Sequence, residues 1–73
     1  MAKLPVVSGN DLIKILTKNG FKVARHKGSH VSLQKENYRT VVPLHGELAK
    51  GTLLAILRQC GIDRTEFENM VLE

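Results

Sequence analysis

Two short segments of the sequence share one design, and the stretch between them has another. In each segment, apolar side chains spaced three and four residues apart are followed by a glycine and then by one further apolar residue. The first segment runs from Leu12 to Phe21 and the second from Leu53 to Ile62. Apolar residues at this spacing fall on one side of an α-helix, and a glycine followed by an apolar residue is typical of a helix end. We therefore predict two helices of the same kind, each with one apolar side to bury.

The first of these helices is expected over about residues 9–19. Ser8 lies just before it, where a side-chain oxygen can accept a hydrogen bond from an unpaired N–H group of the first turn. Asp11 adds negative charge at the same end, which the helix dipole favours. Lys14 and Lys18 fall opposite the apolar side, so we expect them to point into solvent.

Between the two helices the apolar residues recur at every second position, which is the period of a β-strand. Two short runs of this kind are present, at residues 21–24 and 30–34, and a third strand is expected at residues 41–43, where the β-branched Val41 and Val42 are followed by Pro43. We expect residues 27–29 to form a tight turn between the first two strands. Residues 35–39, with Asn37 at their centre, are expected to form a looser turn before the third. The sequence thus predicts a three-stranded antiparallel meander between two helices.

The end of the chain carries the signature of a third helix. Asp63 and Glu66 have the spacing of a capping box, and the apolar residues that follow are Phe67, Met70 and Val71. The two main helices must bury their apolar sides, and one face of the sheet is the available partner, while the other face stays open to water. We therefore predict an α+β fold of the α-β-β-β-α type found in double-stranded-RNA-binding domains, with both main helices on one face of the sheet and a short C-terminal helix. At 73 residues we expect one domain, spanning residues 1–73.

The composition argues against several protein classes. The single cysteine, Cys60, cannot form an internal disulfide, and its spacing from the three histidines fits no zinc site. No apolar run approaches the roughly 20 residues that span a membrane, and the N-terminus lacks the layout of a signal peptide. We therefore expect a cytoplasmic protein without metal, cofactor or membrane contact. Cys60 falls on the apolar side of the second helix, where we expect a small core residue rather than a reactive thiol.

The formal net charge is +4, and the basic residues are concentrated early in the chain. Residues 1–30 hold six Lys or Arg against one acid, residues 31–62 hold four against two, and residues 63–73 hold one against four. A basic surface attracts a phosphate-rich partner through Coulomb attraction and counterion release. Small proteins are also often basic for solubility, and the charge alone does not separate these two interpretations.

His30 is the leading candidate for a chemical role. It alternates with Val31 and Leu33 along a strand. If these two apolar side chains face the helices, His30 faces solvent together with Ser32 and Gln34. Histidine exchanges a proton near neutral pH, and RNA cleavage needs a base for the 2′-hydroxyl proton or an acid for the departing oxygen. Taken alone, however, a single histidine fits an ordinary surface strand residue better than a catalyst.

Cations surround His30 in the sequence, and no acid occurs between Asp11 and Glu36. Such cations can hold a scissile phosphate and stabilise the charge that builds on its oxygens. A solvated basic surface explains them equally well. The candidates for contacts to an RNA backbone are Lys22, Arg25 and Lys27.

Four further residues can each be interpreted either as part of a functional site or, more simply, as ordinary structural or surface residues. Gly28 and Ser29 can present backbone amides and a hydroxyl to a phosphate, although a hairpin needs turn residues for its own sake. Lys50 stands near the start of the second helix, where RNA-binding domains of this shape contact phosphate, or it serves solubility. His45 can act as a second acid–base group, but a hydrogen bond within its own loop is the simpler interpretation.

Taken in order, these residues resemble the HicA, or YcfA-like, toxin family. The resemblance covers nearly the whole chain, from Ser8 to Phe67. Each piece is short and unspecific, whereas their order and spacing are specific. The pieces are Ser8-Gly9, Leu12-Ile13 with Leu16, Gly20-Phe21, Arg25, Gly28-Ser29-His30, Val42-Pro43 with His45, Gly51-Thr52-Leu53 with Ile56-Leu57, and Gly61.

The resemblance implies a toxin of a type II toxin-antitoxin system. Such a toxin is a metal-independent endoribonuclease, an mRNA interferase that cleaves messenger RNA and so inhibits translation and growth. The resemblance also implies that His30 is the catalytic acid or base, that Gly28 and Ser29 shape its turn, and that a HicB-type antitoxin covers the active site. His26 stands where related sequences often carry an uncharged polar residue, so we do not expect it to be a shared catalytic partner.

Two other functions fit the same residues. A non-catalytic RNA-binding module would use the same basic face and fold but would need no histidine at this turn. An interaction protein would instead direct its basic face toward an acidic surface on a partner. Cleavage of RNA that leaves a 2′,3′-cyclic phosphate separates the enzyme from both.

Overall fold

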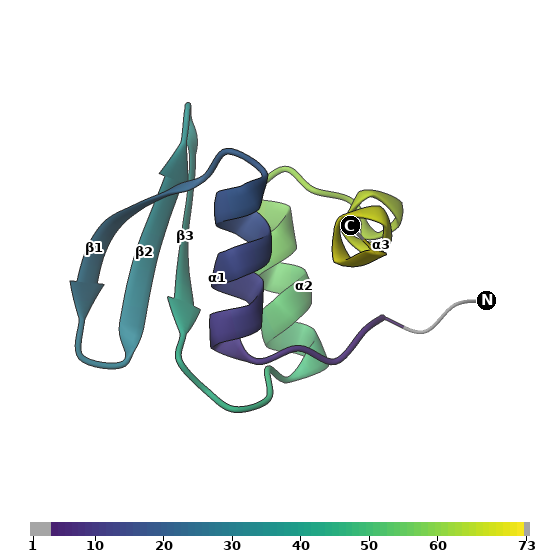
Figure 1. Cartoon of the computed structure of the whole chain (residues 1–73), viewed down its shortest axis with the longest axis horizontal. Helices are drawn as coiled ribbons and strands as arrows, with labels where there is room; N and C mark the ends of the chain where they lie inside the picture. Colours follow the sequence, from purple (N-terminus) through teal and green to yellow (C-terminus); the bar gives the residue numbers. More distant parts are fainter. Residues whose placement is uncertain (1–3, 73) are drawn as a thin grey trace.

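The computed structural model describes residues 4–72. Its elements, in chain order, are α1 (Gly9–Lys18), β1 (Lys22–Lys27), β2 (His30–Lys35), β3 (Tyr38–Pro43), α2 (Lys50–Gln59) and α3 (Arg64–Leu72). The strands form one antiparallel sheet in the order β1-β2-β3. Figure 1 shows α1 and α2 on the β3 side of the sheet and β1 at the edge farthest from the helices. The predicted α+β arrangement, including the short last helix, is confirmed.

Helix α1 starts with a reciprocal cap. The N–H of Asp11 donates to the Ser8 hydroxyl at 3.0 Å, and the N–H of Ser8 donates to the Asp11 carboxylate at 3.3 Å. The sequence predicted the first of these bonds and missed the second, because Asp11 was considered only for its charge. The helix ends at Lys18, one residue earlier than predicted, since Asn19 is its C-terminal cap.

The two glycine-terminated helix ends are built alike, as predicted. The N–H of Phe21 donates to the carbonyl of Leu16 at 3.0 Å, and the N–H of Ile62 donates to the carbonyl of Leu57 at 2.9 Å. The glycine before each has a positive φ, +99° in the first case and +70° in the second. Both ends therefore have the Schellman geometry, and the apolar residue after each glycine turns back over its helix.

Helix α3 also begins with a capping box, as predicted. The N–H of Glu66 donates to the Asp63 carboxylate at 2.8 Å, and the N–H of Asp63 donates to the Glu66 carboxylate at 3.2 Å. Phe67 on this helix is fully buried. The last helix is thus part of the core rather than a free end.

Strand β2 is central, and its residues alternate between the two faces of the sheet. Val31 and Leu33 are buried, and so are their partners on β3, Val42 and Thr40. These side chains make up the inner face, which packs against the helices. The residues of β2 that point the other way are His30, Ser32 and Gln34.

The turn between β2 and β3 is tighter than predicted. Only Glu36 and Asn37 separate the two strands. Glu36 has φ +54°, the left-handed conformation that many two-residue hairpin turns require. The prediction of a looser turn over residues 35–39 was wrong because no glycine marks the turn in the sequence. As a consequence, Arg39 belongs to β3.

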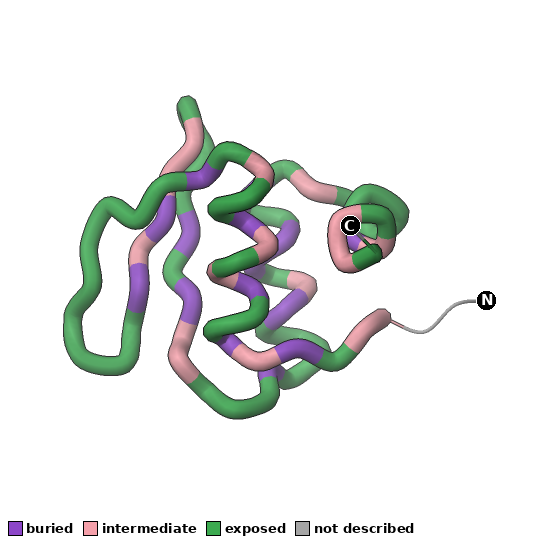
Figure 2. The backbone as a smooth tube through the Cα atoms, viewed as in Figure 1, coloured by how far each residue is buried: buried purple, intermediate pink, exposed green. Residues whose placement is uncertain are grey.

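Strand β1 also differs from the prediction. Its pairing with β2 shifts between Val23 and Arg25, so that Val23 faces Leu33 and Arg25 faces Ser32, with one extra residue left over in β1. Such an extra residue is a β-bulge. Val23 was expected to point into the core together with the other apolar strand residues, but it is 51% exposed because β1 is an edge strand that the helices cover only in small part. Figure 2 shows the whole of β1 as exposed.

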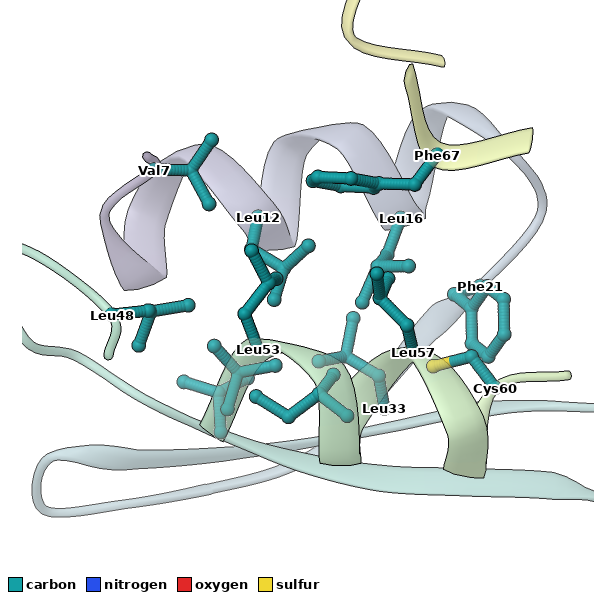
Figure 3. Close-up of a cluster of buried hydrophobic side chains, with 13 residues drawn as sticks. Val7, Leu12, Leu16, Phe21, Leu33, Leu48, Leu53, Leu57, Cys60 and Phe67 are labelled. Carbon is teal, nitrogen blue, oxygen red and sulfur yellow. The ribbon is translucent and has the colours of Figure 1, made fainter. Parts of the chain in front are cut away.

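The core lies between the inner face of the sheet and the helices. Figure 3 shows Leu12 and Leu16 of α1 directed toward Leu53 and Leu57 of α2, with Phe67 beside Leu16. All five side chains are buried almost completely. Burying apolar surface stabilises the fold by roughly 25 cal/mol per Å², so these contacts are the main source of its stability.

The start of α1 lies directly against the chain that leaves β3. A side chain at Gly9 would collide with the carbonyl oxygen of Pro43. The N–H of Gly9 donates to the carbonyl of His45 at 2.9 Å, and the N–H of Leu48 donates to the carbonyl of Val7 at 2.9 Å. These contacts fix the loop that follows the end of β3.

Candidate functional site

The face of the sheet opposite α1 and α2 carries nine residues in three rows, and we call it the open face. Directly paired residues of neighbouring strands point to the same face, so the register assigns its members. Starting from the end with the β1–β2 turn, the rows are Lys27–His30–Pro43, Arg25–Ser32–Val41 and Lys22–Gln34–Arg39. Each of the nine is exposed or half-buried, so the whole face is accessible to a partner.

The β-bulge in β1 brings three cations onto this face. Lys22 and Arg25 are three residues apart, and in a regular strand such residues point to opposite faces. The register shift between Val23 and Arg25 offsets this difference, so both pair with open-face residues of β2. Lys27 follows Arg25 by two residues and shares its face. A local irregularity of the backbone therefore determines the charge of the open face.

His30 is the first residue of β2, and its side chain is exposed. Lys27 lies opposite it on β1, and Pro43 lies opposite it on β3. The predicted orientation of His30, away from the buried Val31 and Leu33, is confirmed by the register. The imidazole is thus held on the central strand with a cation on one side.

The turn before His30 is held in place from two directions. Gly28 has φ +59°, a conformation that favours glycine. The carbonyl of Ser29 accepts a hydrogen bond from the N–H of Leu44 at 2.7 Å, which ties the turn to the chain beyond β3. The His26 ring donates from Nε2 to the carbonyl of Gly28 at 3.0 Å. His26 therefore has a structural role in the turn.

The open face is strongly positive. Its charged members are Lys22, Arg25, Lys27 and Arg39, and no carboxylate is among its nine residues. Like charges gathered on one surface raise the local positive potential and attract an anionic ligand. Apart from His30, the other residues carry a hydroxyl, an amide or an apolar side chain, which suits a surface that also contacts uncharged parts of that ligand.

The geometry near His30 suits chemistry on a bound phosphate. A directly opposite residue such as Lys27 has its Cα about 5 Å away. A diagonal neighbour such as Arg25 lies about 7–8 Å away, within reach of a long side chain. One phosphate beside the imidazole can therefore contact an ammonium and a guanidinium group at the same time. This arrangement can transfer a proton while cations neutralise the charge on phosphate oxygens.

Two candidates from the sequence lie elsewhere. Lys50 is the first residue of α2 and lines a separate cavity with Pro5, Val6 and Arg64, none of which belongs to the sheet. The structure therefore does not bring Lys50 together with the cations of β1. His45 lies in the exposed loop after β3. Its backbone carbonyl, and not its side chain, accepts a hydrogen bond from the N–H of Gly9.

One groove of the molecule lies between α2 and the inner face of the sheet, and His30 does not line it. It has a volume of about 750 Å³ and runs along α2 and the middle of the sheet. Its lining includes Thr52, Ala55 and Gln59 of α2 together with Leu33 and Thr40 from the inner face of the sheet. An exposed imidazole can act on a polymer lying across the face without being enclosed, so chemistry at His30 does not require the groove to surround it.

Sequence reasoning missed two features of this site. Arg39 faces Gln34 and so joins the open face, but the residue was assigned to a loose turn. Arg25 and Lys22 were named as candidates without a reason for them to share a face, because a β-bulge leaves no clear mark in the sequence. Antiparallel pairing of Val42 with Val31 would have placed Arg39 correctly, since pairing then continues residue by residue to the turn.

Three other features were considered for a functional role: the Cys60 thiol, clusters of metal-binding side chains and helices that could cross a membrane. Cys60 is buried, which confirms the prediction of a core residue. This burial raises the pKa of its thiol to about 11. Within residues 4–72, no group of three or more His, Cys, Asp or Glu side chains is arranged to hold a metal ion. None of the helices in that range is long and apolar enough to cross a membrane.

Residues 9–62 match a family model described as the HicA toxin of bacterial toxin-antitoxin, and this range is more than half of the chain. The matched region contains α1, the whole sheet and α2, and it stops before α3. No curated protein matches the chain.

Proposed function

Since the chain belongs to the HicA toxin family of bacterial toxin-antitoxin systems, we propose that this toxin is an endoribonuclease that cleaves messenger RNA with His30 as its acid–base catalyst. One observation carries the proposal. His30 is exposed on the central strand of a face that holds four cations and no acid. Proton transfer and phosphate binding are thereby combined on one accessible surface.

The proposed reaction uses the 2′-hydroxyl of the RNA as the nucleophile. His30 takes the proton of this hydroxyl as its oxygen attacks the adjacent phosphorus. The bond from phosphorus to the 5′-oxygen of the next nucleotide breaks, and that oxygen takes a proton from solvent. Solvent reaches the reaction centre because His30 is exposed. Lys27 and Arg25 stabilise the negative charge on the phosphate oxygens as it builds. The products are a 2′,3′-cyclic phosphate and a 5′-hydroxyl, and no metal takes part.

The proposal includes a partner and a cellular place. Toxins of this kind act together with an antitoxin, and we propose that this one is of the HicB kind and covers the open face. A covered face would keep RNA away from His30. Because messenger RNA is the substrate, we propose that the protein acts in the cytoplasm.

The test is induced expression in bacteria of the wild-type chain, of His30→Ala and of His45→Ala. Growth and the integrity of total messenger RNA are the readouts. We expect the wild type and His45→Ala to stop growth and fragment messages, and His30→Ala to do neither while remaining soluble. Both substitutions remove an exposed imidazole, so they are matched in charge and in packing.

Two outcomes would contradict the proposal. If His30→Ala is as toxic as the wild type, His30 is not the catalyst. If the wild type binds RNA but leaves messages intact, the protein is a non-catalytic RNA-binding module. The ends of the fragments give an independent check, because a 3′-hydroxyl in place of the cyclic phosphate excludes attack by the 2′-hydroxyl.

A further inference from the structure

The third row of the open face, Lys22–Gln34–Arg39, has no part in the reaction proposed above. Gln34 lies on the same strand as His30, β2, and the Cα atoms of the two residues are about 13 Å apart along it. Lys22 lies opposite Gln34 on β1, and Arg39 lies opposite it on β3. The row therefore places a cation on each side of an amide, at the end of the sheet remote from His30.

The side chains of the third row are available to a ligand. Lys22 and Arg39 are exposed, and none of the three makes a hydrogen bond or ion pair with another side chain or backbone group of the described part of the chain. Lys35, which follows on β2 and points the other way, is different. Its ammonium donates to the carbonyl of Asn19 at 2.9 Å and lies 5.7 Å from the centre of the Phe21 ring. The fold thus uses Lys35 and leaves the cations of the third row free.

The chemistry of the third row suits one nucleotide of a single-stranded chain. Two strand spacings separate Lys22 from Arg39, or about 10 Å between Cα atoms, so both long side chains can reach a phosphate that lies above Gln34. A guanidinium group can bind a phosphate with two parallel hydrogen bonds. The amide of Gln34 has two N–H donors and an acceptor oxygen, which match the groups on the edge of an unpaired base. A base contact can read sequence, which a phosphate contact cannot do.

The second row connects the two ends of the open face. Ser32 lies between His30 and Gln34 on the same side of β2, and its partner Val41 is 46% exposed. A chain that lies along β2 crosses this row, where its sugars and bases meet a hydroxyl and an apolar side chain. No carboxylate among the nine residues of the face repels its phosphates on the way. A continuous surface therefore leads from the reaction centre to the third row.

We propose that the third row is a nucleotide-binding subsite for single-stranded RNA that extends past the cut on one side. Lys22 and Arg39 hold a backbone phosphate other than the scissile one, and Gln34 contacts the edge of a base. The proposal rests on the ribonuclease function proposed above, and it adds to that function a residue that determines specificity. Arg39 makes cleavage depend on the length of the RNA, and Gln34 makes it depend on the sequence.

Substrate length tests the phosphate contact. A dinucleoside monophosphate has only the scissile phosphate, so when this phosphate is at His30 none is left for the third row, whereas a longer single-stranded RNA supplies one. Arg39→Gln and Arg58→Gln each remove one exposed positive charge, but Arg58 is on α2 and not on the open face. The readout is kcat/KM for the longer RNA divided by kcat/KM for the dinucleoside monophosphate. We expect this ratio to fall roughly tenfold in Arg39→Gln, the effect of one charged hydrogen bond, and to keep its wild-type value in Arg58→Gln.

An unchanged ratio in folded Arg39→Gln would overturn the subsite, and the ribonuclease function would stand if cleavage by the wild type still required His30. If the wild type cleaves neither substrate, the proposed function itself fails. Binding of the longer RNA gives a second measurement that needs no cleavage. In the His30→Ala background, Arg39→Gln should reduce the slope of log affinity against log salt by about 0.7, the value for one lost phosphate contact. Equal slopes in Arg39→Gln and Arg58→Gln would also overturn the subsite.

The cleavage pattern tests the base contact. Gln34→Ala removes the amide of the third row, and Asn69→Ala removes an exposed amide on α3, away from the sheet. With a set of RNAs of varied sequence, we expect Gln34→Ala to redistribute cleavage among sites without changing the salt slope, because no phosphate contact is lost. Asn69→Ala should keep the wild-type pattern. An unchanged pattern in Gln34→Ala would exclude the base contact.

Discussion

The β1–β2 hairpin and the helical layer, by which we mean α1, α2 and α3, differ in burial and in chemistry. Every residue of β1 is exposed, and three of its six residues are cations on the open face. The helices contribute completely buried side chains such as Leu12, Leu53 and Phe67. The comparison indicates that the buried side chains of the helical layer stabilise this small fold, whereas the proposed activity depends on exposed side chains of the hairpin. Substitutions should therefore change one without the other.

The largest expected effect is in the helical layer. Phe67→Ala removes a fully buried ring, which typically costs about 3–5 kcal/mol. For a chain of 73 residues this is a large part of the total stability. The free energy of unfolding is measured by urea titration followed by circular dichroism. The matched control is Leu72→Ala on the same helix, where the side chain is 84% exposed and a change below about 0.5 kcal/mol is expected. A similar small loss for Phe67→Ala would mean that α3 does not belong to the core.

The second effect tests the contact between α1 and the end of β3. Gly9→Ala places a methyl group against the carbonyl oxygen of Pro43, and overpacking of this kind costs about 1–3 kcal/mol. Gly51→Ala is the same change in the first turn of α2, with nothing within 4 Å of the new atom. It should stabilise the protein by about 0.5–1 kcal/mol, because alanine favours helix more than glycine does. The same urea titration measures both, and equal signs would contradict the close approach of Pro43 to Gly9.

The third effect lies in the hairpin. Lys27→Ala removes the cation opposite His30 and should reduce the rate of RNA cleavage about tenfold, which corresponds to about 1.4 kcal/mol of transition-state stabilisation. Its free energy of unfolding should stay within about 0.5 kcal/mol of the wild type, since Lys27 is exposed. Lys14→Ala, on the exposed side of α1, is the control for loss of one positive charge. If both variants cleave equally well, Lys27 has no part in the reaction.

The smallest effect concerns Cys60. Burial raises its pKa from 9.0 to about 11, so the folded protein holds the thiol proton more tightly than the unfolded chain. The unfolded chain therefore loses this proton first as the pH rises, and the free energy of unfolding should fall between about pH 9 and pH 11 and be unaffected by this group below pH 9. Urea titrations at pH 8 and pH 10.5 test this in the wild type and in Cys60→Ala. The pH-dependent loss should be smaller in Cys60→Ala, and an equal loss would show that other groups cause it.

The sequence predicted the helical layer more accurately than the hairpin. Helix ends depend on local signals, so Gly20 and Gly61 could be recognised as Schellman ends from their neighbours alone. The bulge in β1 arises from pairing with β2 and leaves no local signal, so the exposure of Val23 was not foreseen. The turn from β2 to β3, outside this hairpin, was also misjudged, because Glu36 adopts a positive φ there without glycine and the sequence offers no cue for it.

The same distinction holds for the candidate site. The outward orientation of His30 followed from alternation along one strand, which is a local property. The residues that share a face with His30 are determined by the strand register, so Arg39 was missed. Lys50 lies at the start of α2, where it lines a cavity apart from the sheet. Sequence therefore located the central residue of the candidate site, and the structure was needed to locate its neighbours.

The most direct test of the central claim measures stability and cleavage on the same preparation of His30→Ala. We expect its free energy of unfolding to lie within about 0.5 kcal/mol of the wild type, because His30 is exposed. Its rate of cleavage of single-stranded RNA, measured with a chelator present, should fall by a factor of about 10²–10⁴. Cleavage at the wild-type rate by the purified, correctly folded His30→Ala protein would contradict the claim that the open face of the hairpin carries the activity.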